Sequence, residues 1–216
     1  MSYCDRPKLI LPIAETVTPM PLIVDHDERR RHIAEVAQRL IAQLGMEKVT
    51  LRDVAREAGF SATIVGHYFR DKLHLLSFTS ANARARAATR IERALAAGTP
   101  PLDCLAEYLP LDEERQLEWQ AWFGFWSKAT AEPEIAAERL DGVNQSREMI
   151  AAILAEAIKL GDVPAGTDCV HGGTQVQVLV DGMACLVTMD PAHWPAERQR
   201  AFFHAELEKM LGIVRP

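Results

Sequence analysis

Hydrophobic side chains recur at helical spacing along most of the chain, starting after residue 24. The first such pattern places apolar residues three or four positions apart, at Ile33, Val36, Leu40, Ile41 and Leu44. Asp25 and Glu28 before it resemble a capping box, in which two side chains bond free amides at a helix start. Gly45 follows the last apolar position, as glycine commonly does at a helix end. The pattern predicts a first helix over residues 25–44.

Three more helices are predicted in quick succession, the last running to about residue 97. Thr50 and Asp53 form a second capping box, and the short helix that they start should end at Gly59. Ser61 can cap a third helix of about seven residues, and Asp71 can cap a long fourth one. Two short helices joined by a tight turn make a helix-turn-helix, whose second helix typically enters the major groove of DNA.

The third helix is predicted to have one buried and one exposed face. Ile64, Val65 and Phe69 should point into a small three-helix core, which Phe60 in the turn can fill. The outward positions of this helix are Ala62, Thr63, Gly66 and His67. The same spacing also occurs in buried helix pairs, so the pattern alone does not establish DNA binding.

Beyond a Gly-Thr-Pro-Pro break at residues 98–101, the pattern stays helical to the end of the chain. Helices are predicted at about 102–109, 112–131, 134–160, 168–188 and 195–211. The segment Val176–Val180 alternates β-branched residues with Gln, but no second convincing strand exists to pair with it. The predicted fold class is therefore all-α. We expect a flexible proline-containing arm over 1–24, a helix-turn-helix DNA-binding domain over 25–72, and a helical ligand-binding and dimerisation domain over 73–216.

Charge is distributed unevenly along the chain. Residues 25–90 hold twelve Lys and Arg against eight Asp and Glu, a net +4, whereas residues 91–216 hold ten against twenty, a net −10. A basic block on an acidic body is expected when only one end of a protein approaches phosphates. The content of 48% hydrophobic and 25% charged residues is typical of soluble globular proteins. No apolar run approaches the roughly 18 residues of a membrane span.

The distribution of reactive residues argues against catalysis and against bound metal. The four cysteines are far apart and include no Cys-x-x-Cys pair, which argues against zinc and disulfides and favours a reducing cytoplasm. The chain contains no His-Glu-x-x-His, Gly-x-Ser-x-Gly, P-loop or Rossmann motif, and its seven histidines are scattered. The sequence therefore predicts no enzyme, no metal site and no cofactor.

The run Thr50–Leu76, TLRDVAREAGFSATIVGHYFRDKLHLL, resembles the signature of the TetR family of transcriptional repressors. The hallmark of that signature is a His/Tyr-Phe-x-x-Lys ending, which His67-Tyr68-Phe69-Arg70-Asp71-Lys72 matches in place. The resemblance covers residues 30–76. It implies a homodimer that binds a palindromic operator in double-stranded DNA and leaves it when a small-molecule effector binds.

The resemblance implies one set of residues near the DNA backbone. Thr50 and Arg52 would lie there at the start of the second helix, while Tyr68 and Lys72 would hold phosphates. Lys72 suits this role because it begins a helix, where unpaired amides and the helix dipole already favour an anion. A Tyr hydroxyl can donate to phosphate, a contact that sets position without distinguishing sequence.

A second set of residues is implied at the base edges. Thr63, Gly66 and His67 would face the bases, with Ser61 and Ala62 beside them at the start of the third helix. Thr can contact a thymine methyl, and His can donate to guanine. Many relatives carry a bulky aromatic where this chain has Gly66, so one contact of those relatives is absent here.

An aromatic segment between residues 117 and 129 is the candidate ligand site. Trp119, Trp122, Phe123 and Trp126 share one helix face, which predicts either core or dimer packing or an aromatic box for a cation. Asp181 is a carboxylate within an apolar helix and needs a partner. This segment and Val180-Asp181-Gly182 resemble the betaine-regulon repressors, a choline-responsive branch of the family, which implies a cationic effector.

Two alternatives stay open in the C-terminal part. Its last two helices carry apolar residues that form either a four-helix dimer interface or the core of one chain. These residues are Leu179, Val180, Met183, Leu186 and Val187, with small Gly182 and Ala184, and Phe202, Phe203 and Leu207. The chain could also be a DNA-binding regulator that is controlled by a protein partner or by no effector.

Overall fold

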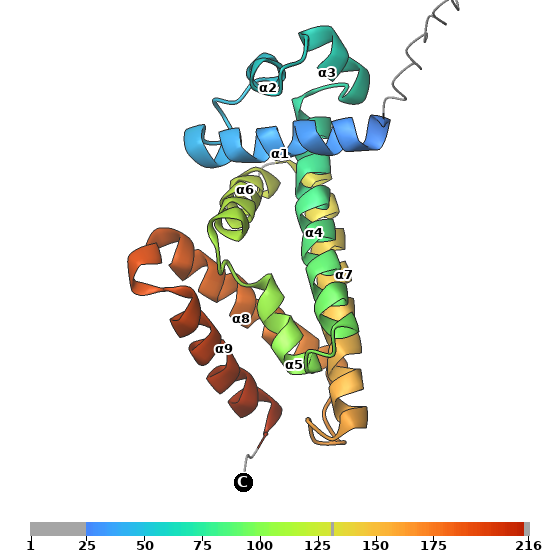
Figure 1. Ribbon diagram of the computed structural model, residues 1–216, viewed down its shortest axis with the longest axis vertical. Coiled ribbons are helices and arrows are strands. Elements are labelled where there is room, and N and C mark those ends of the chain that lie inside the picture. The colour runs from blue at the N-terminus through green and yellow to red at the C-terminus, as the bar shows by residue number, and fades with distance from the viewer. Residues whose placement is uncertain (1–24, 131, 214–216) are drawn as a thin grey trace, which may run out of the picture.

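The computed structural model describes residues 25–130 and 132–213, and within them it shows helices and no strand (Figure 1). The order is α1 (His26–Leu44), α2 (Leu51–Glu57), α3 (Ala62–Tyr68), α4 (Lys72–Ala96), α5 (Pro101–Cys104), the 3-10 helix η1 (Leu105–Tyr108), α6 (Glu113–Ala129), α7 (Pro133–Leu160), α8 (Cys169–Met189), the 3-10 helix η2 (Pro191–His193) and α9 (Ala196–Leu211). The all-α prediction is confirmed. The arm predicted over 1–24 lies outside the described residues.

Local capping interactions set the starts of the first four helices. The capping box of Thr50 and Asp53 is complete, with both backbone-to-side-chain bonds at 3.2 Å. Ser61 and Asp71 each accept a bond from the third amide of the helix that follows, at 3.2 and 2.8 Å. Asp25 accepts from the amides of residues 27 and 28. A cap of this kind stabilises a helix by about 1 kcal/mol, which is why these four helices begin where predicted.

One predicted segment differs in detail from the observed helices, and a segment that could have been a strand is helical as predicted. The expected helix at 102–109 is a single α-helical turn, α5, continued by the tighter η1. The segment Val176–Val180, which alternates like a strand, lies inside α8 as predicted.

The helices form two connected parts (Figure 1). Helices α2 and α3 lie over α1 at one end of the molecule, and α4 runs from there toward the opposite end. With 25 residues, α4 is about 37 Å long. Helices α6, α7, α8 and α9 form most of the other part, in which α7 packs against both α6 and α8 and α6 lies next to α1.

The core of the helix-turn-helix extends into other helices. Val65 and Phe69 are fully buried there, and Phe60 packs against them as predicted. Ile64 is only half-buried, less than predicted. The same core includes Leu75 and Leu76 of α4, Ala121 and Phe125 of α6, and Ile135 of α7. Helix α6 is therefore packed directly against the helix-turn-helix.

The second core joins α4, α5, α7, α8 and α9. Most of the apolar residues that could have formed a dimer interface are buried within the chain: Val180, Met183, Phe203 and Leu207 belong to this core, and Ala184 and Val187 are also buried. For these residues the alternative of a core within one chain is correct. Leu186 and Phe202 remain exposed, at 47% and 41%. Among the described residues, no helix has both the length and the apolar character needed to cross a membrane.

Candidate nucleic-acid interface and ligand cavity

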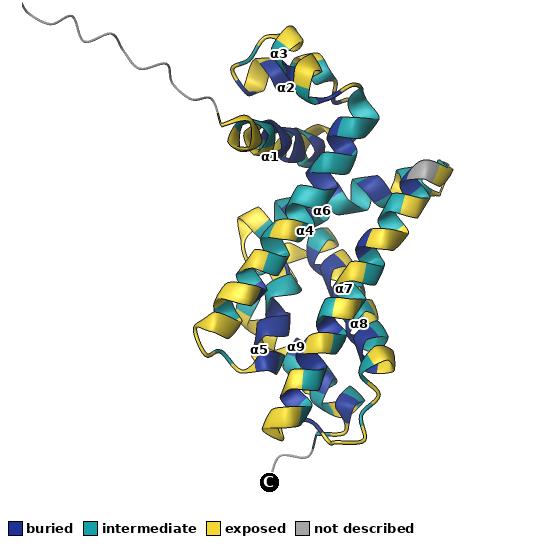
Figure 2. Ribbon diagram, turned by 90° about the vertical axis from the view of Figure 1, so that its right-hand side faces the viewer, coloured by how far each residue is buried: buried dark blue, intermediate teal, exposed yellow. Residues whose placement is uncertain are grey.

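The outer edge of α3 is open to solvent. Ala62, Thr63, Gly66 and His67 are all exposed on it (Figure 2). A Cβ added at Gly66 would have no other atom within 4 Å, so nothing in the protein covers this position. Ser61 is also exposed, but its hydroxyl oxygen is engaged in capping the helix. The structure thus brings together all five residues predicted to lie along the bases.

The start of α2, which precedes α3 in the chain, carries the two residues predicted to lie near the DNA backbone. Thr50 is exposed, and its hydroxyl donates to Asp53 at 2.6 Å. That hydrogen bond holds the pKa of the Asp53 carboxyl below its usual value. Arg52 is exposed on the first turn of the helix. A guanidinium placed there is able to reach a phosphate, whereas the Thr50 hydroxyl would first have to leave Asp53.

Tyr68 and Lys72, the predicted phosphate contacts, both have partners within the chain. The Tyr68 hydroxyl lies 2.9 Å from Nδ1 of His26, and Lys72 Nζ donates to the backbone oxygen of Glu47 at 3.1 Å. An ammonium group has three donors, so two remain on Lys72 for a phosphate. His26 was not found from the sequence, because it lies 42 positions from Tyr68 and only the fold brings them together.

A cavity of about 250 Å³ lies in the second part of the molecule. Helices α4, η1, α6, α7 and α8 all contribute to its wall. The lining residues include small alanines of α4 and a set of larger side chains: Arg84, Arg90, Tyr108, Glu118, Trp119, Trp122, Gln145, Ser146, Met149, Gln177 and Asp181. This volume suits a small organic molecule.

Three of the five predicted ligand residues meet at this cavity. Trp119, Trp122 and Asp181 line it, whereas Phe123 and Trp126 do not. Phe123 packs instead between Trp119 and Trp126, with ring centroids 5.6 and 5.2 Å apart. The aromatic face is therefore divided between the cavity and the packing behind it.

Two arginines, which the sequence did not reveal as neighbours of the tryptophans, lie against these rings. The guanidinium of Arg139 lies 3.6 Å from the ring centroid of Trp126 and 5.2 Å from that of Trp122. Arg84 lies 5.3 Å from Trp122. The chain's own cations thus already contact Trp122 and Trp126. In the described part of the chain, no arginine lies over Trp119.

Asp181 is the acidic group of the cavity that has no guanidinium bonded to it. Gln177 donates to its carboxylate at 2.8 Å. Burial raises the pKa of Asp181 to about 6, although Gln177 and the charge of Arg139 act in the opposite direction. Burial also lowers the pKa of Arg139 to about 10. At pH 7 Asp181 is therefore mainly ionised and poorly solvated, and a cationic ligand would relieve that state.

Tyr108 closes one side of the cavity as a neutral donor. Burial raises the pKa of Tyr108 to about 12, so the hydroxyl stays protonated. It contacts the sulfur of Met149 at 3.3 Å, and the Tyr108 backbone oxygen accepts from Trp119 Nε1 at 2.9 Å. The indole of Trp119 is thereby held in place with its polar edge satisfied.

Comparison with known proteins gives matches to both parts of the chain. Residues 33–77 match the family of bacterial regulatory proteins described as tetR, and residues 102–212 match the C-terminal domain of BetI-type transcriptional repressors. The regulator PksA of Bacillus subtilis is 29% identical over 195 residues, covering 88% of this chain and 94% of its own. The regulator BetI of Burkholderia thailandensis is 30% identical over 169 residues, covering 76% and 84%. A regulator from Saccharomonospora viridis, solved in complex with choline, is 26% identical with a TM-score of 0.73, covering 88% and 100%.

Proposed function

Because this chain belongs to the TetR family of transcriptional regulators and has a BetI-type C-terminal domain, we propose that it is a homodimeric repressor released from a palindromic operator by a small cationic effector. The observation that carries this proposal is the course of α4. This helix begins at Lys72 beside the helix-turn-helix and forms the cavity wall through residues 81–90. A ligand that favours one position of α4 changes operator affinity by its differential affinity for the two positions.

The edge of α3 supplies the proposed sequence readout. Thr63 and His67 are exposed there with no covering side chain at Gly66, so the edge can enter a major groove. Lys72 would hold a phosphate at the start of α4, and Arg52 another at the start of α2. Half-sites would lie about 34–36 Å apart, or one further turn, if two copies read one palindrome.

The proposed dimer uses the outer stripe of α8. Val178, Gly182, Cys185, Leu186 and Met189 follow one another at helical spacing and are exposed, and Phe202 of α9 is exposed as well. Exposure reaches 67% at Val178 and 70% at Met189. A stripe of this kind is suited to packing against a second copy in a four-helix arrangement.

Light scattering with size exclusion tests the dimer. Leu186→Glu places a charge in the stripe and should convert a dimer to a monomer. Leu160→Glu is the matched control, because Leu160 is also exposed, at 61% against 47% for Leu186, but lies at the end of α7. A wild-type mass of one chain at micromolar concentration would contradict the dimer.

The cavity supports a cation as effector through Asp181 and the ring of Trp119, over which no arginine of the described residues lies. Choline, which the Saccharomonospora viridis protein holds, is therefore the first probe. A cavity lined by Trp122 and Asp181 also favours control by a small molecule over control by a protein partner alone.

The test begins with operators selected by the wild-type protein from a random duplex library. Choline chloride and its uncharged isostere 3,3-dimethyl-1-butanol are then compared in thermal shift and in operator binding. Choline should raise the unfolding temperature and weaken operator binding, and the isostere should do neither. Asp181→Asn should remove the difference between the two compounds. Equal behaviour of both compounds on the wild type would contradict a cationic effector, and failure to select any sequence would contradict operator binding.

A further inference from the structure

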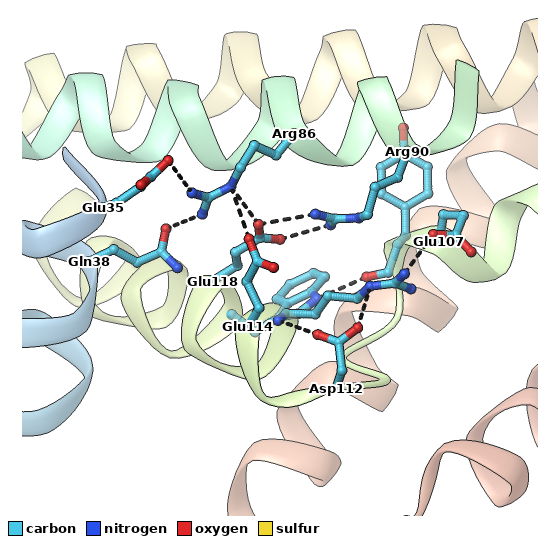
Figure 3. A network of polar contacts seen from close by, with 11 residues as sticks. Glu35, Gln38, Arg86, Arg90, Glu107, Asp112, Glu114 and Glu118 are labelled. Carbon is cyan, nitrogen blue, oxygen red and sulfur yellow. Dashed lines mark hydrogen bonds and ion pairs between the residues drawn. The ribbon is translucent and has the colours of Figure 1, made fainter. Parts of the chain in front are cut away.

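A network of buried polar side chains joins the cavity wall to α1 (Figure 3). At its centre is Glu118 of α6, which is only 7% exposed. Its carboxylate accepts from Arg90 at 2.8 and 3.1 Å and from Nε of Arg86 at 2.8 Å. Arg90 and Glu118 both line the cavity, whereas Arg86 does not. One carboxylate is thus shared between a guanidinium on the cavity side and a guanidinium facing away from it.

Arg86 continues the network into α1. Its Nη2 donates to Oε1 of Gln38 at 2.5 Å, and its Nη1 lies 3.4 Å from the carboxylate of Glu35. Gln38 is 4% exposed, so little water can replace Arg86 as its partner. A second cavity of about 270 Å³ lies on this side and is lined by Glu35, Gln38, Arg86 and Glu114. The pair of Arg86 and Glu118 therefore separates the two cavities.

We infer that Glu118 is a positioning residue that transmits occupancy of the ligand cavity to α1 through Arg86. This inference rests on the proposed function and deepens it. Since Glu118 is 7% exposed and shared between two guanidinium groups, a change in its bond to Arg90 alters its hold on Arg86. Arg90 also has a buried Nε without a hydrogen-bond partner, so the wall contains a donor that an occupant can engage.

Movement of α1 reaches the DNA-reading edge through the shared core. Ile33 and Val36 of α1 are buried in the same cluster as Val65 of α3. Packed cores of this kind shift as units rather than deform locally. The route runs from α6 to α1 through Arg86 of α4, so it crosses α4 rather than following its length, and substitution of Gln38 or Glu118 tests it.

A double-mutant cycle without any ligand tests the route. Gln38→Ala, Glu118→Gln and the double variant are compared in affinity for the operator selected by the wild type. We expect each single change to weaken operator binding at least threefold. The double variant should bind the operator as well as the more strongly affected of the two single variants. Both changes act through Arg86, so the second has nothing left to disrupt.

The matched control cycle pairs Gln38→Ala with Glu107→Gln. Glu107 forms a partly buried ion pair of the same kind, 2.8 Å from Arg115, but it makes no bond to Arg86 or Gln38. In this control cycle, the loss of operator affinity in the double variant should equal the product of the losses caused by Glu107→Gln and Gln38→Ala. The inference is overturned if the double variant of Gln38→Ala and Glu118→Gln loses operator affinity by the product of the two single losses, within twofold. Glu118→Asp, which keeps the charge and shortens the side chain, replaces Glu118→Gln if that variant does not fold.

A second arm uses choline chloride as the probe. Arg86 itself does not line the cavity, so choline should still raise the unfolding temperature of Arg86→Gln. Its weakening of operator binding should fall at least threefold. An undiminished choline effect in Arg86→Gln overturns the inference while the proposed function stands. If choline does not bind the wild type, the cationic effector is contradicted and the ligand-free cycle decides the inference.

Discussion

The DNA-reading edge and the ligand cavity are assembled in opposite ways. The residues proposed to contact DNA lie within residues 50–72, on one segment whose helices are started by local caps. The cavity wall comes from residues 81–181 and from five separate helices. DNA approaches a convex surface from outside, which one segment can supply. A cavity must be enclosed, so distant parts of the chain have to meet around it.

Polar groups also differ between the two regions. Near the reading edge, the side chains of Thr50, Ser61 and Asp71 all have local partners. Around the cavity, Gln177 Oε1 and Arg90 Nε are buried without hydrogen-bond partners. Buried unpaired groups are destabilising and are typically explained by a ligand or water. The capping side chains near the reading edge therefore have their hydrogen bonds within the chain, whereas polar atoms around the cavity can still bind a further partner.

The largest expected effect tests whether the two regions unfold separately. Phe69→Ala in the first core and Phe203→Ala in the second each remove a fully buried ring, and each should destabilise the chain by about 3–5 kcal/mol. Since α4 and α6 contribute to the first core, Phe69→Ala should also shift unfolding of the second region.

Denaturant titration with two probes measures this effect. Trp119 and Trp194 pack against the second core, and Trp122 and Trp126 lie on α6. Tryptophan fluorescence therefore reports the second region together with α6, while circular dichroism reports the whole chain. We expect both signals to shift together in Phe69→Ala. A fluorescence transition at the wild-type midpoint would show that the regions unfold independently.

The next effect concerns Asp181 and pH. Its pKa is raised to about 6 in the folded chain, above the value of 3.8 for an unperturbed carboxyl. The contribution of Asp181 to the free energy of unfolding is therefore fully present below pH 4. It is lost as the pH rises through 6, and the loss is at most about 3 kcal/mol. Asp181→Asn should stabilise the protein at pH 7.5 more than at pH 4, measured as the difference in unfolding free energy from the wild type.

Asp190→Asn is the control for this pH dependence. The hydrogen bond from the His193 side chain lowers the pKa of Asp190, so its replacement should have the opposite sign at neutral pH. An Asp181→Asn effect that is equal at both pH values would contradict a raised pKa at Asp181.

A smaller effect is expected for the reading edge. His67→Ala should reduce discrimination at one or two base pairs by roughly 1–3 kcal/mol, because a specific donor is lost. Repeating the operator selection with the variant measures the change. His193→Ala, also exposed but remote on η2, should leave the preference intact. Unchanged discrimination in His67→Ala would remove His67 from the base contacts.

The smallest effect is expected at a phosphate contact. Lys72→Ala should weaken binding almost equally for all DNA sequences and make the salt dependence shallower by about 0.9 in slope. Anisotropy titrations across a salt series measure both quantities. Lys159→Ala, on an exposed part of α7, should change neither. A loss confined to one operator sequence would contradict a phosphate role for Lys72.

The sequence predicted the DNA-reading edge more accurately than the cavity. Capping residues and helical spacing gave correct boundaries for α2, α3 and the start of α4, because those interactions join residues only three positions apart. At the cavity, helical spacing identified the aromatic face of α6 but not its division. Trp119 and Trp122 line the cavity while Phe123 and Trp126 pack elsewhere, and only the neighbouring helices decide this.

Periodicity and local capping by themselves determined the helices, the outward edge of α3 and the acidic group within α8. Tertiary structure alone decided which side of α8 is buried, which arginines cover the tryptophans, and that Glu118 links Arg90 to Arg86. The physical reason is the range of the interactions. Caps and helical faces depend on residues a few positions apart, whereas a cavity and a buried ion network depend on side chains from helices that meet only after folding.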